Sequence, residues 1–153
     1  MNQKFVISEA SFEDAKQISE IEKQNFSMPW SEKSILDSMK QDNYIFLKAE
    51  YENNIVGYVG FYYSLDEGDI TNIAVTPSFR RLGIGRQLLL TLISECKKRN
   101  IASIMLEVRI SNDNAIDLYK KTGFSEIGIR KNFYEKPVED AILMKCIIDR
   151  NCY

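Results

Sequence analysis

The sequence predicts a mixed α/β fold within a single domain that spans residues 1–153. Its length fits one domain and leaves little room for a second. Segments with strand and helix patterns follow one another in the order β-α-α-β-β-β-α-β-α-β-β. Because this order contains both short hairpin connections and helical crossovers, we expect antiparallel and parallel strands in one mixed sheet.

The N-terminal segments predict one strand and two helices. Residues 4–8 have the pattern of a short strand, and Ser11 precedes apolar residues at helical spacing. Asp14 stands three positions after Ser11, which resembles a capping box with Asp in place of Glu. Residues 25–29 break this helix, and we expect Ser31 to cap the second one.

Strand signals dominate the next part of the chain. Residues 44–51 and 54–63 are rich in aromatic and β-branched side chains. They flank residues 52–54, Glu-Asn-Asn, so the two strands should form a hairpin. A third strand covers about residues 68–75, and Pro77 ends it because proline cannot donate to a β-ladder.

Residues 84–99 predict the clearest helix, because apolar side chains recur on one of its faces. A strand at 102–108 follows, and then a shorter helix at 112–122 with Gly123 at its C′ position. Residues 124–129 and 141–148 predict two final strands, with a polar, aromatic loop between them at 130–140. The apolar stripe of the long helix consists of Leu88, Leu89, Leu92, Ile93 and Cys96.

The charge balance disfavours some classes of function. The net charge is −2, from 20 basic and 22 acidic residues, which argues against a nucleic-acid binder that relies on a broad basic surface. Histidine is absent, which removes the commonest general base and the commonest metal ligand. We therefore expect no metal, and any acid–base chemistry should fall to Asp, Glu, Tyr, Lys or Cys.

The cysteines are three in number and widely spaced, at Cys96, Cys146 and Cys152. No CxxC pair exists, so neither a zinc site nor a disulfide framework is indicated. Reduced thiols in a cytoplasmic protein are the simplest interpretation. No secretory signal is apparent, and no apolar run approaches the roughly 20 residues needed to span a bilayer.

The turn between the strand at 68–75 and the long helix has the features of an anion site. The first amide N–H groups of a helix lack intrahelical partners, and with the helix dipole they attract anions. Gly83 and Gly85 carry no Cβ, so a diphosphate can approach the main chain. Arg80, Arg81 and Arg86 add positive charge. The alternative is that the two glycines only shape a strand-to-helix loop.

This turn resembles the R/Q-x-x-G-x-G/A signature of the GNAT superfamily of N-acetyltransferases, with Arg80, Gly83 and Gly85 at the signature positions. It is not a P-loop, because no GK[ST] is present, and Leu88 replaces the third glycine of a dinucleotide-binding fingerprint. The resemblance runs through the whole chain. It is greatest to the superfamily's enzymes that acetylate the N-terminal alanine of the eighteenth small-subunit ribosomal protein, at residues 26–34, 72–75, 106–124 and 139–144.

The resemblance implies a GNAT fold, with a central, mostly antiparallel sheet of six to seven strands flanked by about four helices. It implies acetyl-CoA as the cosubstrate, with the amides of the turn holding the diphosphate and the preceding strand contacting the pantetheine arm. It also implies that this strand splays away from the strand at 102–108. The implied cofactor-binding residues are Ile73, Ala74, Val75, Arg81, Leu82, Gly83, Ile84, Gly85, Arg86 and Asn112.

Amine acetylation requires a base for the amine, an acid for the departing thiolate and a donor for the developing oxyanion. The resemblance assigns Glu107 as the base, acting directly or through a water, and Tyr119 as the acid. An N–H group near Ile73 to Val75 would serve the oxyanion. The alternatives are that Glu107 is an exposed strand residue paired with Arg109 or a lysine, and that Tyr119 is a core residue. Without His no Cys–His dyad exists, which favours direct attack by the amine.

The acceptor implied by the resemblance is the N-terminal peptide of a ribosomal protein. We expect the enzyme to be a monomer and to be located in the cytoplasm. Residues 26–30 and 130–139 combine aromatic side chains with proline and could form the walls of its binding site, or pack as ordinary loops. Glu139 and Asp140 could attract a basic substrate or be solvated charges. Another acceptor amine, such as a polyamine or an amino acid, remains an alternative. A domain that binds acetyl-CoA without turnover is another, and intact Glu107 and Tyr119 argue against it.

Overall fold

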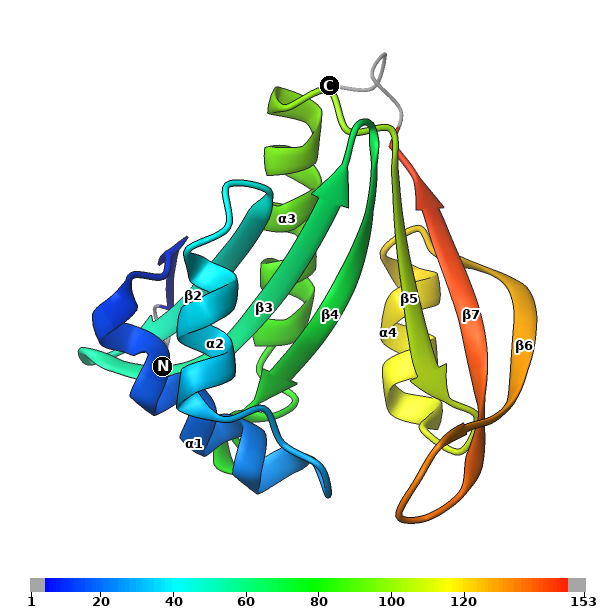
Figure 1. The fold of residues 1–153 in the computed structure, drawn as a ribbon, viewed down its shortest axis with the longest axis horizontal. Helices are drawn as coiled ribbons and strands as arrows, with labels where there is room; N and C mark the ends of the chain where they lie inside the picture. The colour runs from blue at the N-terminus through cyan, green and yellow to red at the C-terminus, as the bar shows by residue number, and fades with distance from the viewer. Residues whose placement is uncertain (1–4, 149–153) are drawn as a thin grey trace.

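A computed structural model describes residues 5–148 and confirms the mixed α/β fold, with seven strands and four α-helices in that range (Figure 1). The elements follow one another in the predicted order. None of the helices in the described range is long and apolar enough to cross a membrane. The strands are β1 (Val6–Glu9), β2 (Tyr44–Tyr51), β3 (Asn54–Ser64), β4 (Glu67–Val75), β5 (Ser103–Arg109), β6 (Ser125–Tyr134) and β7 (Glu139–Ile147).

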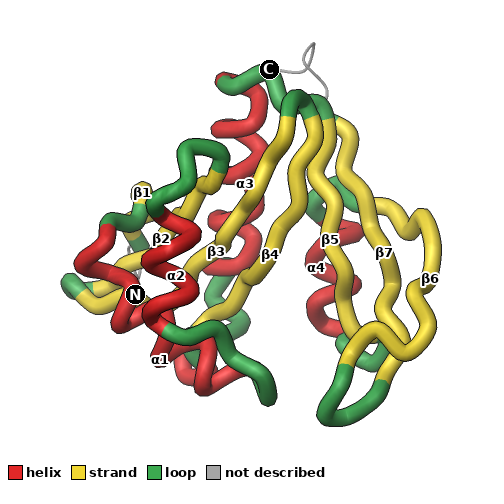
Figure 2. The backbone as a smooth tube through the Cα atoms, in the orientation of Figure 1, coloured by secondary structure: helices red, strands yellow, loops and turns green. Residues whose placement is uncertain are grey.

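The seven strands form one sheet in the order β1-β2-β3-β4-β5-β7-β6 (Figure 2). Every neighbouring pair is antiparallel except β4 and β5, which run parallel. These two strands pair at only three positions, and the last of them joins Asp69 to Met105. Beyond Asp69 the strands separate, as the family resemblance implied. The sheet is therefore open along its middle, between Ile70–Val75 and Leu106–Arg109.

The helices cover both faces of the sheet (Figure 1). The two helices that precede β2 in the chain pack on β2, β3 and β4, around a small core that includes Ile18, Ile35 and Tyr58. The two helices that follow β4 lie on the opposite face, over the larger core. This core includes Leu88 and Leu92 from the predicted apolar stripe. The helices are α1 (Ala15–Asn25), α2 (Glu32–Met39), α3 (Ile84–Lys98) and α4 (Asp113–Lys121), with short 3-10 turns η1 (Phe12–Asp14) and η2 (Pro77–Phe79).

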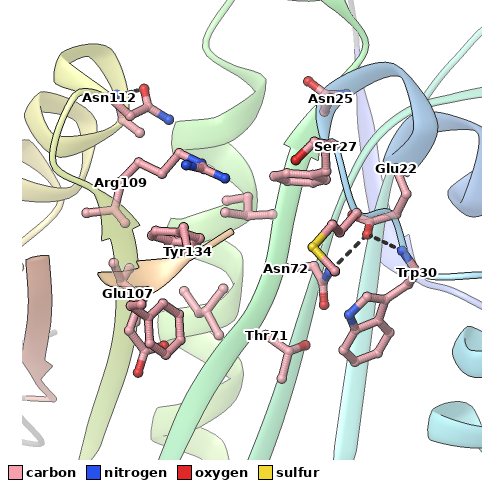
Figure 3. Close-up of a pocket in the computed structure, with 18 of the residues that line it drawn as sticks. Glu22, Asn25, Ser27, Trp30, Thr71, Asn72, Glu107, Arg109, Asn112 and Tyr134 are labelled. Carbon is pink, nitrogen blue, oxygen red and sulfur yellow. Dashed lines mark hydrogen bonds between the residues drawn. The ribbon is translucent and has the colours of Figure 1, made fainter. Parts of the chain in front are cut away.

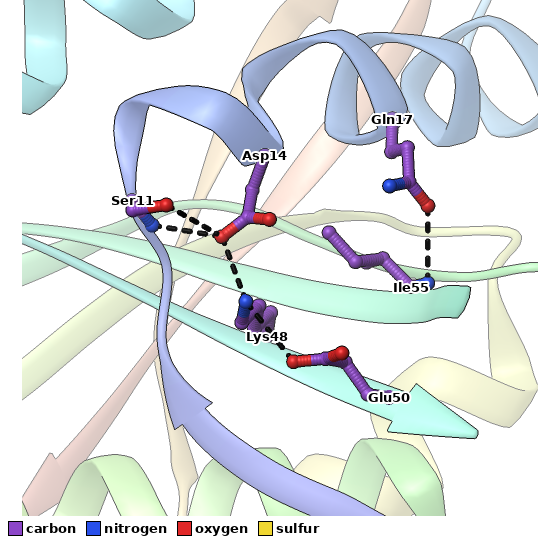
Figure 4. A network of polar contacts seen from close by, with 6 residues as sticks. All are labelled: Ser11, Asp14, Gln17, Lys48, Glu50 and Ile55. Atoms are coloured by element: carbon purple, nitrogen blue, oxygen red, sulfur yellow. Dashed lines mark hydrogen bonds and ion pairs between the residues drawn. The ribbon is translucent and has the colours of Figure 1, made fainter. Parts of the chain in front are cut away.

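Polar contacts anchor α1 to the sheet (Figure 4). The Ser11 amide donates to the Asp14 carboxylate over 2.8 Å, which confirms the acidic half of the predicted capping box. The same carboxylate accepts a hydrogen bond from Lys48 of β2, also over 2.8 Å. One turn later, Gln17 accepts a hydrogen bond from the Ile55 amide of β3. These contacts fix the helix on two strands, and the C-terminal end of α1 then lies at the opening between β4 and β5.

The structure also confirms the predicted hairpin turn and two predicted helix ends. Glu52 and Asn53 both have positive φ, 50° and 67°, as a tight two-residue hairpin turn requires. Ser31 caps α2 by accepting a hydrogen bond from the Ser34 amide. Gly123 follows α4 with φ of 107°, the left-handed conformation expected at C′.

The prediction of a loop over residues 130–140 is wrong at both ends, because residues 139 and 140 already belong to β7. Arg130 to Tyr134 belong to β6, and only residues 135–138 connect it to β7. The strand is at the edge of the sheet, pairs with β7 alone and shifts register twice. Nearly all of its side chains are exposed, so it shows no apolar alternation. The first half of β6 was predicted as a strand over residues 124–129, but its polar second half gives no period-two signal in the sequence.

Candidate functional site

Two adjoining cavities form a cleft where β4 and β5 separate. The larger has a volume of about 640 Å³ and lies between α1, the two strands and the β6–β7 turn, and we call it the strand cavity (Figure 3). The other has a volume of about 520 Å³ and lies against the β4–α3 turn, and we call it the turn cavity. Six residues line both, so the two cavities lie side by side. They are Asn25, Phe26, Ile73, Asn112, Ala115 and Tyr119.

The turn cavity brings together nine of the ten predicted cofactor-binding residues. Leu82 is the exception, since its side chain is 44% exposed and does not line the cavity. Gly83 adopts φ of 84° at the N-cap of α3, and no atom lies within 4 Å of the place where a Cβ would stand. The first helical hydrogen bond runs from Gln87 to Gly83, so the preceding amides of α3 have no partner within the helix. The turn is an open cradle of N–H donors.

The edge of β4 that faces the cleft presents further amides. The Thr76 amide donates to the Val56 carbonyl of β3 over 2.8 Å. Amides alternate in direction along an antiparallel strand, so the N–H groups of Ile73 and Val75 point to the opposite edge, where β5 has separated. The strand therefore offers two main-chain donors to a molecule in the cleft.

Glu107 lies on β5 in the wall of the strand cavity, with 27% of its side chain exposed. Its ion-pair partner is neither Arg109 nor a lysine but Arg130 of β6, with 3.7 Å between Oε1 and Nε. Burial raises the pKa of the Glu107 carboxyl above its ordinary value, Arg130 lowers it, and the charge of Asp69 raises it. A carboxyl group with a raised pKa in a half-closed cleft suits proton transfer near neutral pH.

Tyr119 lies on α4, where it is buried and lines both cavities. Its ring packs against Phe124 with 5.7 Å between the centroids. Burial raises the pKa of the phenol well above its ordinary value, and the neighbouring Tyr134 adds to this. Tyr119 is therefore a core residue, as one interpretation of the sequence had it, and it also borders the cleft.

Asn112 stands at the N-terminal end of α4 and borders the cleft. Its side chain caps α4 by accepting a hydrogen bond from the Ala115 amide over 3.2 Å, and the residue lines both cavities.

Arg109 organises the outer wall of the strand cavity. Its guanidinium donates to the carbonyls of Glu135 and Pro137 and to the Glu139 carboxylate, over 3.0 to 3.1 Å. It also lies 4.4 Å from the centroid of the Tyr134 ring. These contacts hold the β6–β7 turn in place, with Tyr134 and Glu135 facing the cavity. Burial and the charge of Glu107 raise the pKa of Tyr134 to about 12.

Glu139 and Asp140 serve the protein's own backbone. Glu139 accepts from the Ser111 amide over 2.7 Å and from Arg109, and Asp140 accepts from the Asn132 amide over 2.8 Å. Neither residue lines the cleft. Their role in the structure is to fix two loops, rather than to face a substrate.

The sequence analysis missed Glu22, a buried carboxylate in the wall of the strand cavity. It accepts hydrogen bonds from the Trp30 amide, the Asn72 side chain and the Tyr58 hydroxyl. Figure 3 shows the first two of these contacts. A signal was present, because Glu22 follows Ile18 by four residues and so shares the apolar face of its helix.

Arg80 also has a contact that the sequence did not indicate. Its guanidinium donates to the Asn25 side chain at the end of α1, and Asn25 in turn donates to the Ile21 carbonyl over 2.8 Å. The turn cavity and the end of α1 are therefore linked by a direct hydrogen bond. Arg80, the arginine of the signature, is therefore hydrogen-bonded to the protein's own α1.

No metal-binding group of three or more His, Cys, Asp or Glu side chains is present among residues 5–148. Cys96 and Cys146 are buried and free, and neither lines the cleft. Burial raises the pKa of the Cys96 thiol to about 12, so it is not a nucleophile at neutral pH. Cys152 lies outside the described residues.

Comparison with known proteins gives consistent matches. The sequence profile of the acetyltransferase (GNAT) family matches residues 15–124. The ribosomal protein bS18-alanine N-acetyltransferase of Haemophilus influenzae is 38% identical over 146 residues, which cover 94% of this chain and 99% of that one. The Escherichia coli enzyme of the same name is 40% identical over 126 residues, 81% of this chain and 84% of that one. A crystal structure of the Escherichia coli ribosomal-protein-S18-alanine N-acetyltransferase superposes with a TM-score of 0.89, at 36% identity, over 98% of this chain and 99% of that chain.

Proposed function

The chain belongs to the acetyltransferase (GNAT) family, and from that premise we propose that it acetylates the N-terminal alanine of ribosomal protein bS18. It is an acetyl-CoA-dependent N-acetyltransferase. The observation that carries the proposed acceptor is the similarity, at 38% identity over nearly the full length, to an enzyme of that name. The two-part cleft supports it, because one part suits a coenzyme and the other is large enough for the end of a peptide.

The residues of the turn cavity fit acetyl-CoA. The open cradle at Gly83 and the free amides of α3 suit a diphosphate, with Arg81 and Arg86 adjacent. Ile73 and Val75 offer N–H groups along the edge where a pantetheine arm would lie in an extended conformation. When bound there, acetyl-CoA supplies the thioester. These assignments, with the other predicted residues of the turn, are part of the proposal.

Glu107 is the proposed general base. It takes a proton from the acceptor amine, directly or through a water, so that the nitrogen lone pair can form a bond to the acetyl carbon. Its position in the wall of the strand cavity places it on the acceptor side of the cleft. The raised pKa of its carboxyl group matches this task near neutral pH.

Tyr119 is the proposed general acid. As the C–S bond breaks, its hydroxyl gives a proton to the sulfur; because burial raises its pKa, the phenol is still protonated at neutral pH and holds that proton until the thiolate departs. Its place between the two cavities suits this role, because the thioester must lie where the coenzyme and acceptor meet. The N–H groups of Ile73 or Val75 would stabilise the negative charge that develops on the acetyl oxygen.

The test is an acetylation assay with acetyl-CoA and the N-terminal peptide of bS18, analysed by mass spectrometry. Peptides that begin Ala-Arg, Ser-Arg and Met-Arg measure the preference for alanine. The same Ala-Arg peptide with a blocked N-terminus is the control for acetylation of lysine. Faster transfer to a polyamine or an amino acid would replace the proposed acceptor, and acetyl-CoA binding without any transfer would remove the proposed activity.

We also propose that the 153 residues act as a single domain and as a monomer, in the cytoplasm, where ribosomal proteins are made. The β6–β7 hairpin supports the first point, since it extends beyond the matched residues 15–124 and completes the cleft. Light scattering on the purified protein measures the oligomeric state.

A further inference from the structure

The Glu22 carboxylate is buried in the wall of a cavity, and the proposed mechanism does not use it. Only 1% of the residue is exposed. Trp30 of the α1–α2 connection donates its amide to Oε1 over 3.0 Å, and Asn72 of β4 donates its side-chain nitrogen to the same oxygen over 3.1 Å. The Tyr58 hydroxyl of β3 donates to Oε2. One carboxylate therefore joins three separate elements of the acceptor side.

No ion pair with Lys or Arg is found for Glu22 among the described residues. Burial raises the pKa of its carboxyl group, while the hydrogen bonds from Tyr58, Trp30 and Asn72 lower it. A buried carboxyl group that is held only by neutral donors is costly, which favours a role in the site over a role in stability alone.

The carboxylate determines which way the Asn72 side chain faces. An ionised carboxylate only accepts hydrogen bonds, so Asn72 must turn its NH₂ group to Glu22, as Figure 3 shows. The amide oxygen, Oδ1, then faces away from Glu22. This oxygen exposes less than 1 Å² and has no hydrogen-bond partner in the described structure. An unpaired buried acceptor is unfavourable until a donor reaches it.

We propose that Glu22 is a positioning residue that acts through Asn72, by holding Oδ1 as the hydrogen-bond acceptor for the α-amine of the incoming peptide. The α-amine is an N–H donor in both its charged and its neutral form. Both residues line the strand cavity, on the α1 and β4 side, and Glu107 lies on the β5 side. Met28 is part of the same wall and is 56% exposed. The amine is thus held between Asn72 and the proposed base.

This inference rests on the proposed peptide acceptor, and steady-state kinetics with the Ala-Arg peptide test it. In Glu22→Gln the side chain can donate as well as accept, so Asn72 is free to flip. We expect the KM for the peptide to rise about tenfold, the effect of losing one good hydrogen bond. The KM for acetyl-CoA should stay within about twofold, because Glu22 does not line the turn cavity.

A double-mutant cycle shows whether Glu22 acts through Asn72. Asn72→Ala alone should also raise the KM for the peptide about tenfold. The double variant should show the same tenfold rise and not about a hundredfold, because both changes remove one interaction. Additive effects would show that Glu22 does not act through Asn72. An unchanged KM for the peptide in either single variant would overturn the proposal.

Gln17→Ala is the matched control on the same helix. Gln17 holds α1 to the Ile55 amide but does not line the cleft, so its loss should lower the thermal midpoint and leave the KM for the peptide unchanged (Figure 4). If Glu22→Gln fails to fold, Asn72→Ala alone decides the question. A wild-type protein that acetylates no peptide would refute the proposed function. A normal wild type with an unaffected Asn72→Ala variant would refute only this inference.

Discussion

The Glu107 carboxylate on β5 and the Arg130 guanidinium on β6 lie 3.7 Å apart, across the intervening strand β7. Three strands contribute charge at this point, since Asp69 of β4 also acts on Glu107. The strands separate beyond the pair of Asp69 with Met105, so Glu107, two residues after Met105, lies near the closed end of the opening. The basicity of Glu107 is therefore set by groups that come from both sides of the opening.

Removal of Arg130 should make the enzyme more sensitive to acid. Glu107 acts as a base only when ionised, so kcat/KM falls as the pH drops through its pKa. Burial and Asp69 raise this pKa and Arg130 lowers it, while Tyr134 faces the same carboxylate as a neutral phenol. In Arg130→Met the lowering influence is lost, so the acid limb of the pH profile should move to higher pH.

The measurement is kcat/KM for the peptide from about pH 5 to about pH 9, with Arg130→Lys as the variant that keeps the charge. Arg130→Lys should keep the acid limb near its wild-type position. A limb that stays in place in Arg130→Met, or moves to lower pH, would show that Glu107 is not the titrating base.

Glu107→Gln should lower kcat by about 10²–10⁴, the usual contribution of a general base. The affinity for acetyl-CoA should hardly change, because Glu107 lines the strand cavity and not the turn cavity. Isothermal calorimetry measures this affinity, and steady-state assays measure kcat. Glu126→Gln on the exposed β6 is a matched control and should retain wild-type turnover. Full activity in Glu107→Gln would remove the base from the mechanism.

Tyr119→Phe keeps the ring that packs against Phe124 and removes only the hydroxyl. We expect kcat to fall by about 10²–10⁴, because the departing thiolate loses its proton donor. The thermal midpoint should change little, since the apolar contacts of the ring remain. Single-turnover assays with the peptide separate chemistry from product release. The exposed Tyr62→Phe is the control, and equal rates for the two variants would contradict the role of Tyr119.

Most of the fold could be predicted because its signals are local. Apolar periodicity identified α3, and the caps at Ser31 and Gly123 depend on residues only a few positions apart. Register and strand order depend on distant contacts, so the parallel pairing of β4 with β5 could not be derived from spacing. The second half of β6, residues 130–134, was missed for the same reason, since only pairing with β7 makes it a strand.

In the site, too, features built by neighbouring residues could be predicted and features built by distant residues could not. The turn around Gly83 could be found because consecutive residues build it. Glu22 and Asn72 are 50 positions apart and meet only in the folded chain. The ion pair of Glu107 with Arg130 rather than with its neighbour Arg109 likewise depends on the sheet, because Arg109 turns instead to Glu139. Long-range pairing of polar groups left no pattern that a single sequence shows.

Gly83→Val should weaken the binding of acetyl-CoA for two separable reasons. A β-branched residue is strained at φ of 84°, at a cost of roughly 1–2 kcal/mol in the free energy of unfolding. The space above the turn is open in the structure, so the new side chain would fill the cradle that we assign to the diphosphate. We expect the Kd for acetyl-CoA to rise at least about tenfold, equivalent to about 1.4 kcal/mol.

Gly128→Val distinguishes these effects from a general loss of stability. Gly128 also has open space around it, but it lies on β6 without a positive φ and away from both cavities. Its substitution should leave the Kd for acetyl-CoA unchanged in calorimetry, while thermal unfolding reports the stability of both variants. If Gly83→Val bound acetyl-CoA as tightly as Gly128→Val does, the diphosphate could not occupy the cradle, and the coenzyme would have to bind elsewhere in the cleft.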